Sequence, residues 1–171
     1  MTPILVLNWN NAADTIACLE SLRELSDCAY EILVVDNGSD DGSAARLRAW
    51  GEKLSCFQDV TEVQAVTGRR SPACPAELDG RARRAQIMLL CLPENLGYAG
   101  GNNAGLRLLL QERADWECVW LLNNDTQVHP RALAELLAEQ EQSGADMVGS
   151  TLADYEARER VQAMAGATVN P

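Results

Sequence analysis

The sequence predicts an α/β fold in which a mostly parallel sheet is flanked by helices. Two observations support this prediction. Short apolar runs of strand length alternate with segments whose apolar residues recur at helical spacing. Such alternation is typical of parallel strands whose connecting helices cover both faces of the sheet. Polar clusters also follow four of the apolar runs directly, and ligands of such sheets bind beyond the carboxyl ends of the strands.

The first half of the chain predicts two strand–helix units. Apolar residues predict strands at Pro3–Leu7 and Tyr30–Val35. A helix is expected after each strand, the first with Asn11 as its N-cap and the second capped by Asp41 or Ser43. The apolar face of the first helix is formed by Ile16, Leu19, Leu22 and Leu25.

The second half repeats this alternation. Gln86–Leu92 is predicted as a strong strand and Val119–Leu122 as a short buried strand. A glycine-rich helix start at Tyr98–Gly105 lies between them, and a later helix opens at His129 and ends before Gly144. Further short strands are expected at Leu54–Val60, Asp146–Thr151 and Arg160–Met164.

A segment at about 61–85 interrupts the alternation and is predicted to be an inserted loop. It mixes glycine, proline and polar residues without a clear period. Five of the fourteen Lys and Arg residues lie in it. These are Arg69, Arg70, Arg81, Arg83 and Arg84. They could close over an anionic ligand or touch an acidic membrane surface, although a solvated loop is the favoured interpretation.

Composition limits the function classes. The 171 residues are expected to form one domain, or part of one, over 1–171. The net charge of −11 argues against nucleic acid as a partner, because phosphate binding depends on Lys and Arg. The six cysteines form no C-x-x-C pair, so zinc and redox motifs lack support, and reduced cytoplasmic thiols are expected. We expect a cytoplasmic protein, with peripheral contact to the membrane left open.

The four polar clusters predict one site. They lie at Asn8–Asn10, Asp36–Ser39, Glu94–Asn95 and Asn123–Asp125. If the strands are parallel, all four meet at one edge of the sheet. The last cluster offers amide and carboxylate oxygens, which Mg²⁺ and Mn²⁺ prefer, although a plain polar turn would use the same residues.

Two common phosphate loops are excluded, because the glycine-rich stretch Gly97–Gly105 contains neither G-x-G-x-x-G nor the Lys of a P-loop. The pair Gly100 and Gly101 fits two interpretations equally. It lets backbone approach a ligand at a helix N-terminus, or it allows close packing of a helix on a strand.

Four motifs resemble those of a known family. LVLNWNN, VVDNGSDDGS, PENLGYAGGNNAG and WLLNNDT are similar, in order and spacing, to the signatures of family 2 glycosyltransferases. The rhamnosyltransferase-like branch is the nearest match, and the resemblance covers Pro3 to about Gly166 apart from the inserted loop. It implies the Rossmann-like glycosyltransferase A fold and inverting transfer of a sugar from a nucleotide-diphosphate donor to an acceptor hydroxyl. The acceptor would be a saccharide or a lipid-linked molecule, as in cell-wall or polysaccharide biosynthesis.

The resemblance also implies roles for individual donor-binding residues. The nucleotide pocket would be lined by Asn8, Trp9 and Asn10. The base would be contacted by Asp36, with Asn37 and Ser39 beside it. The ribose and phosphates would be approached by Asn95, Gly100, Gly101 and Asn102.

The metal site implied by the resemblance is centred on Asp125. This carboxylate would hold Mg²⁺ or Mn²⁺, which would bridge the diphosphate and stabilise the leaving group. The family motif is Asp-x-Asp, but Asn123 occupies its first position here, so weaker metal binding is expected. His129 could add a ligand, although an ordinary residue at a helix start is favoured.

No residue up to Pro171 is predicted to be the general base. The carboxylates of Asp146, Asp154, Glu156 and Glu159 are expected to be surface charges. We therefore expect the donor-binding part of a longer enzyme. The alternatives are a non-catalytic nucleotide-sugar-binding fragment and, less favoured, a sugar-phosphate nucleotidyltransferase, whose glycine-rich loop is replaced here by Asn10–Ala13.

Overall fold

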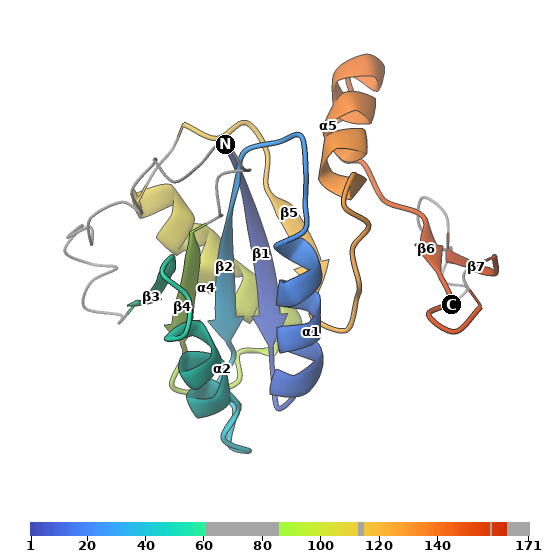
Figure 1. Cartoon of the computed structure of the whole chain (residues 1–171). Helices are drawn as coiled ribbons and strands as arrows, with labels where there is room; N and C mark the ends of the chain where they lie inside the picture. The colour runs from blue at the N-terminus through green and yellow to red at the C-terminus, as the bar shows by residue number, and fades with distance from the viewer. Residues whose placement is uncertain (61–85, 113–114, 158, 164–171) are drawn as a thin grey trace, which may run out of the picture.

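A five-stranded sheet forms the centre of the protein (Figure 1). The computed structural model describes residues 1–60, 86–112, 115–157 and 159–163. Strands lie in the order β3-β4-β2-β1-β5, and each neighbouring pair is parallel. Their bounds are β1 Thr2–Asn8, β2 Tyr30–Asp36, β3 Phe57–Val60, β4 Ile87–Cys91 and β5 Trp120–Asn123. The predicted parallel α/β fold is confirmed.

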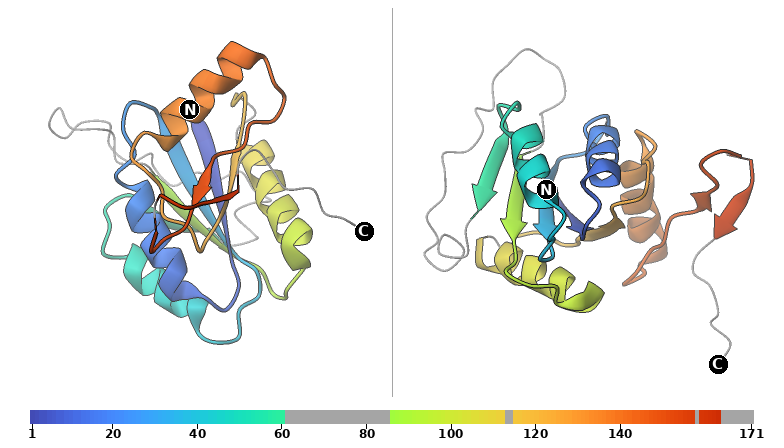
Figure 2. Two further views of the ribbon diagram at one scale, coloured as in Figure 1. Left: turned by 90° about the vertical axis from the view of Figure 1, so that its right-hand side faces the viewer. Right: turned by 90° about the horizontal axis from the view of Figure 1, so that it is seen from below.

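Helices cover both faces of the sheet (Figure 2). They are α1 Ala12–Leu22, α2 Ser43–Gly51, α4 Gly97–Glu112 and α5 Ala132–Ser143. Because alternate residues of a strand point to opposite faces, Ile4 and Val6 pack with α1, α2 and α5, whereas Leu5 packs with α4. This two-sided burial explains why the central strands are continuous apolar runs.

Strand register brings the polar clusters together. In the β1–β2 pair, Asn8 lies beside Asp36, so both strands end at the same level. The backbone N–H of Leu92 donates to the carbonyl of Asp36 at 2.8 Å, which places the end of β4 there as well. Leu7 pairs with Asn123 of β5. The predicted convergence at one edge is therefore confirmed.

The helix ends follow local sequence signals. The N-cap of α2 is Gly42, with φ +82°, rather than the predicted Asp41 or Ser43, and the Asp41 carboxylate before it accepts the Ser43 N–H at 2.8 Å. Gly144 ends α5 in the left-handed conformation, with φ +63°. In α4, a Cβ at Gly105 would lie 2.5 Å from Leu5 Cδ1. Glycines in this helix therefore allow close packing on the sheet.

Two strand predictions were wrong. β5 is not buried but alternates between half-buried and exposed residues, because among the described strands it lies at the edge of the sheet and pairs with β1 alone. Asp146–Thr151 is not a strand. Its Met147 side chain is 89% exposed, so the segment has no buried face to hold it against a sheet. The hairpin of β6 Leu152–Ala153 and β7 Val161–Ala163 follows instead and projects from the main sheet (Figure 1).

Other predictions concern the inserted loop and the cysteines. The predicted loop at 61–85 and Cys74 lie outside the described residues. The five described cysteines are free thiols, as predicted. They are Cys18, Cys28, Cys56, Cys91 and Cys118. In the described ranges, no helix combines the length and apolarity needed to cross a membrane.

Candidate functional site

A cleft of about 460 Å³ lies at the carboxyl edge of the sheet. Its walls come from the ends of β1 and β2, the start of α4 and the turn after β5. The lining residues are Leu7, Trp9, Asn37, Asn95, Gly97, Tyr98, Asn123, Asn124 and Asp125. Segments more than 100 positions apart in the sequence therefore meet at one cleft.

The β2 side of the cleft, defined as Asn8 with Asp36–Ser39, is held by a buried polar cluster. Asn8 Nδ2 donates to Asp36 Oδ1 at 2.6 Å. The Ser39 hydroxyl donates to the same oxygen at 2.7 Å, and the Ser39 N–H donates to Asp36 Oδ2 at 3.2 Å. Asn8 is fully buried and Asp36 is 2% exposed. Three donors compensate the buried carboxylate, so these side chains form the support of the cleft wall.

Asn37 connects this side to the start of α4. Its Oδ1 accepts the Leu96 N–H at 3.0 Å. Its Nδ2 donates to Asn95 Oδ1 at 2.9 Å and to the Gly97 carbonyl at 3.1 Å. Every polar atom of this 2%-exposed amide is therefore bonded. Asn37 fixes the loop that forms one wall of the cleft.

Close backbone packing supports the same wall. Gly38 has φ +68°, and a Cβ there would lie 2.3 Å from the carbonyl carbon of Glu94. Only glycine fits this position, because the left-handed conformation and the close approach both exclude a side chain.

The β5 turn, defined as Asn123–Asp125, forms the opposite wall. Asn123 Oδ1 accepts a hydrogen bond from the Tyr98 hydroxyl at 3.2 Å. Asn124 Nδ2 donates to Thr15 Oγ1 at 2.8 Å. In the described part of the chain, the exposed Asp125 carboxylate makes no hydrogen bond or ion pair. It is a free anionic oxygen donor on the cleft wall.

The oxygen atoms of the β5 turn suit a hard divalent cation only if a bound substrate supplies further ligands. Residues 1–60, 86–112, 115–157 and 159–163 contain no group of three or more His, Cys, Asp or Glu side chains that could hold a metal. Mg²⁺ is commonly held by one or two carboxylates, several waters and the phosphates of a substrate. Asp125 with the amide oxygen of Asn123 satisfies that pattern.

Cys18 lies behind the β5 turn and is not a cation ligand. Its Sγ is 3.9 Å from the Asn123 carbonyl oxygen and 3.8 Å from Thr126 Oγ1. Burial raises the pKa of the thiol to about 11; a hydrogen bond with Thr126 lowers it, and the nearby Asp125 charge raises it further. The thiol is therefore protonated at neutral pH, and it is the thiolate that binds metals or acts as a nucleophile.

Two aromatic side chains are exposed at the cleft. Trp9 is 55% exposed and Tyr98 is 61% exposed. An exposed aromatic face beside polar groups is suited to a planar or ring-shaped ligand. Trp9 was predicted from the sequence, whereas Tyr98 was not, because it lies inside the glycine-rich stretch.

Some other lining residues were not predicted from the sequence. Conversely, several predicted residues do not line the cleft. The other missed residues are Leu7 and Gly97, whereas Asn124 was predicted only as part of the Asn123–Asp125 cluster, without a role of its own. The predicted residues that do not line the cleft are Asn8, Asn10, Asp36, Ser39, Gly100, Gly101 and Asn102. Asn10 pairs with Asp40, and Asn102 Nδ2 donates to the Tyr98 carbonyl at 2.9 Å. A Cβ at Gly101 would lie 2.5 Å from Leu7 Cδ1, so that glycine contributes helix packing.

The remaining candidates have ordinary roles. His129 is exposed, and its Nδ1 accepts the Arg131 N–H at 3.2 Å at the start of α5. Asp146, Glu156 and Glu159 are exposed surface charges, as predicted. Asp154 is half-buried and accepts the Glu156 N–H at 3.0 Å in a turn.

A parallel sheet with a polar cleft at its carboxyl edge defines an α/β domain that binds ligands at that edge. Comparison with known families identifies the family to which this domain belongs. The family described as Glycosyl transferase family 2 matches residues 4–64 and 76–166. The chain therefore belongs to glycosyl transferase family 2, as its motifs predicted.

Solved structures show the same fold. S. aureus TarS is 19% identical over 85% of this chain and 20% of its own, with a TM-score of 0.53. The shorter S. aureus TarS 1-349 is 15% identical over 85% of this chain and 34% of its own, with a TM-score of 0.52. The chain thus spans about a third or less of the length of these proteins. No curated protein matches it.

Proposed function

We propose that this chain is the donor-binding part of a glycosyltransferase that uses a nucleotide-diphosphate sugar and a divalent cation. The transfer to an acceptor hydroxyl would proceed with inversion. The observation that carries the proposal is the free Asp125 carboxylate on the same cleft as the exposed Trp9. S. aureus TarS 1-349, which shares the fold, has structures in complex with UDP and with UDP-GlcNAc.

The nucleoside would bind near Trp9. Its indole offers an apolar face on which a planar base can stack, an interaction that is tolerant of base identity. Asn95 Oδ1 accepts bonds from Asn37 Nδ2 and the Gly97 N–H. Its Nδ2 donates no hydrogen bond to the described residues and can therefore donate to the donor substrate. The sequence also predicts a contact between Asp36 and the base. That contact would have to use carboxylate lone pairs that the hydrogen-bond donors around Asp36 leave free.

The diphosphate needs compensation in a chain with a net charge of −11. The N-terminus of α4, at Gly97 and Tyr98, lines the cleft and favours negative charge. A cation would be held by Asp125, with Asn123 as a weaker second ligand because its oxygen already accepts the Tyr98 hydroxyl. When bound, such a cation stabilises the charge that develops on the leaving nucleoside diphosphate.

The non-catalytic nucleotide-sugar-binding fragment is the second candidate, and one observation favours it. Among the described residues that line the cleft, Asp125 is the only carboxylate. It cannot both hold a cation and deprotonate the attacking hydroxyl, so a general base would have to come from outside these lining residues. The family match favours a glycosyltransferase over a sugar-phosphate nucleotidyltransferase. The rhamnosyltransferase-like branch, the acceptor class and the cytoplasmic location stay predictions.

Calorimetry with nucleoside diphosphates, with and without Mn²⁺, tests the binding proposal. We expect Mn²⁺ to strengthen binding to the unmodified chain and Asp125→Asn to remove that strengthening. Asp146→Asn is the matched control, since Asp146 is an exposed aspartate that does not line the cleft. Absence of nucleotide binding would refute the proposed function. Equal Mn²⁺ dependence in Asp125→Asn would remove Asp125 from the cation site.

Hydrolysis of nucleotide sugars separates the two candidates. A transferase donor site with a bound cation is expected to release sugar slowly to water when no acceptor is present. A fragment that only binds the donor would release none. Product formation is measured by chromatography, with Asp125→Asn as the inactive control.

A further inference from the structure

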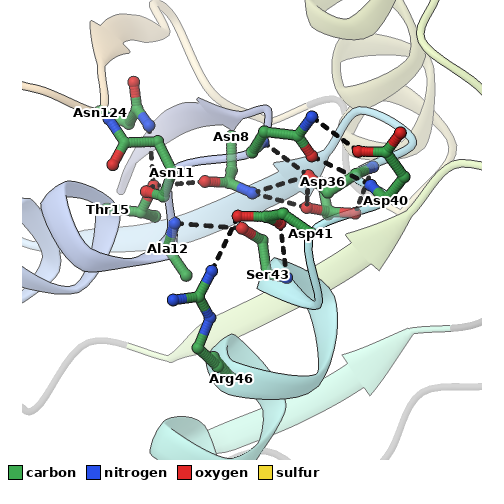
Figure 3. Close-up of polar contacts among 12 residues, drawn as sticks. Asn8, Asn11, Ala12, Thr15, Asp36, Asp40, Asp41, Ser43, Arg46 and Asn124 are labelled. Carbon is green, nitrogen blue, oxygen red and sulfur yellow. Dashed lines mark hydrogen bonds and ion pairs between the residues drawn. The ribbon is translucent and has the colours of Figure 1, made fainter.

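A continuous line of polar side chains crosses from the β5 turn to the β2 side of the cleft (Figure 3). Asn124 Nδ2 donates to Thr15 Oγ1 at 2.8 Å. Thr15 Oγ1 donates to Asn8 Oδ1 at 2.7 Å, and Asn8 Nδ2 donates to Asp36 Oδ1 at 2.6 Å. We call this line the Asn124–Asp36 relay. Thr15 and Asn8 are fully buried, so water does not compete for the Thr15–Asn8 and Asn8–Asp36 bonds, whereas the Asn124–Thr15 bond is partly buried.

The relay has a fixed direction. A carboxylate only accepts hydrogen bonds, so Asp36 forces Asn8 to present its nitrogen to it and its oxygen to Thr15. The Thr15 hydroxyl must then donate its single hydrogen to Asn8. Towards Asn124 the Thr15 oxygen can only accept, so Asn124 must present its side-chain nitrogen. The charge at one end therefore sets the orientation of an amide at the other end, and consecutive bonds of this kind strengthen each other.

A competing acceptor does not change this direction. The carbonyl oxygen of Asn11 lies 2.9 Å from the Thr15 hydroxyl and can share its single hydrogen. If the hydrogen went to Asn11 alone, the oxygens of Thr15 and Asn8 would face each other at 2.7 Å without a hydrogen between them. That arrangement is repulsive, so the bond to Asn8 is retained.

The β5 turn is held from both faces of the sheet. Thr15 belongs to α1, and Tyr98, which donates to Asn123, belongs to α4 on the opposite face (Figure 2). The adjacent amides of Asn123 and Asn124 are therefore hydrogen-bonded to neighbouring helices. The next residue, Asp125, keeps a free carboxylate. The Asn124–Thr15 contact is partly buried, whereas the Tyr98 side chain is 61% exposed.

We propose that Thr15 is a positioning residue that orients the β5 turn for cation binding and ties it to the β2 side of the cleft. Thr15 does not line the cleft and acts through Asn124. The ligand part of this inference rests on the proposed function, but the orientation of the turn is a property of the free protein. Removing the hydroxyl is expected to weaken cation binding about ten-fold, as is typical for residues that orient metal ligands.

Three variants of threonine test this role. Thr15→Val keeps the shape of the side chain and removes its hydroxyl, whereas Thr15→Ser restores a hydroxyl at the same position. Thr2→Val is the matched control, because Thr2 is a buried threonine at the start of β1, the end of the strand away from Asn8. The readouts are calorimetric binding of a nucleoside diphosphate with and without Mn²⁺, and backbone and side-chain amide signals of the β5 turn measured by NMR without ligand.

We expect Thr15→Val to lower the Mn²⁺-induced gain in nucleotide affinity about ten-fold, with a smaller change in the affinity measured without Mn²⁺. In the free protein, the signals of Asn124 and Asp125 should shift or broaden. Thr15→Ser and Thr2→Val should retain the Mn²⁺-induced gain and the signals of the unmodified chain. A purely structural role would lower the melting temperature and leave the gain in the folded protein unchanged.

The outcomes are separable from those of the proposed function. A folded Thr15→Val that keeps both the Mn²⁺-induced gain and the turn signals overturns the positioning role. If the unmodified chain binds no nucleoside diphosphate, the proposed function fails, and the turn signals alone decide the role of Thr15. If Thr15→Val does not fold, Asn124→Ala breaks the relay at its half-buried end and is measured in the same way.

Discussion

The two walls of the cleft differ in how many of their polar side chains are hydrogen-bonded within the protein. On the β2 side, Asn8, Asp36 and Asn37 are buried. The side chains of Asn8 and Asp36 bond each other and Ser39, and the Asn37 side chain bonds the loop around Leu96. On the β5 turn, Asn123 and Asp125 are exposed, and the Asp125 carboxylate has no internal partner among the described residues. One wall therefore has its polar groups bonded internally and supports the shape of the cleft, whereas the other keeps a carboxylate available for a ligand.

Position in the sheet explains the difference. β2 has neighbours on both sides, and all seven of its residues are buried. In the described part of the sheet, β5 pairs with β1 alone, and its residues alternate between half-buried and exposed. A polar group at the end of a central strand must find an internal partner, because burial without one is costly. A polar group at the end of an edge strand can stay free for a ligand.

The largest expected effect is on the β2 side. Asn8→Ala removes a donor from the buried Asp36 carboxylate and an acceptor from Thr15, so we expect it to lower the free energy of unfolding by about 3 kcal/mol. Asn123→Ala, on the exposed wall, should change it by less than about 0.5 kcal/mol. Urea denaturation measures both. Similar losses in the two variants would contradict the difference between the walls.

A smaller loss is expected from Gly101→Ala beneath the same wall. The added Cβ would lie 2.5 Å from Leu7 Cδ1 and 3.0 Å from Asn37 Cγ. Overpacking of this kind costs about 1–3 kcal/mol, and displacement of Asn37 should also weaken nucleotide binding. Asn103→Ala, at an exposed position of the same helix, is the control and should be within about 0.5 kcal/mol of the unmodified chain. Thermal denaturation and calorimetry test both effects.

Trp9→Ala should affect binding rather than stability. The indole is 55% exposed at the cleft, so little core packing is lost. Loss of base stacking is expected to weaken nucleoside diphosphate binding by about 1–2 kcal/mol, and Trp9→Phe should retain most of the affinity. Calorimetry at fixed Mn²⁺ gives the difference. An unchanged affinity in Trp9→Ala would place the base elsewhere.

The sequence predicted the parallel sheet and its polar edge well, because both depend on local patterns. Apolar runs mark strands, and Asn8 and Asp36 follow two of them directly. The sequence could not show that these two residues bond each other, because that depends on the register of strands 28 residues apart. Exposure of β5 was missed for a related reason: an apolar run does not reveal whether its strand lies at the centre or at the edge.

The smallest effect is expected from Tyr98→Phe, which removes the outer contact of the β5 turn. This hydrogen bond is 3.2 Å long and exposed, so its loss should change the free energy of unfolding by less than about 0.5 kcal/mol. The Mn²⁺-induced gain in nucleotide affinity should stay within about two-fold of the unmodified chain, against about ten-fold for Thr15→Val. If both variants lowered this gain equally, the exposed Tyr98 contact would hold the turn as firmly as the partly buried Asn124–Thr15 contact. Burial of a contact would then not decide how firmly it holds the turn.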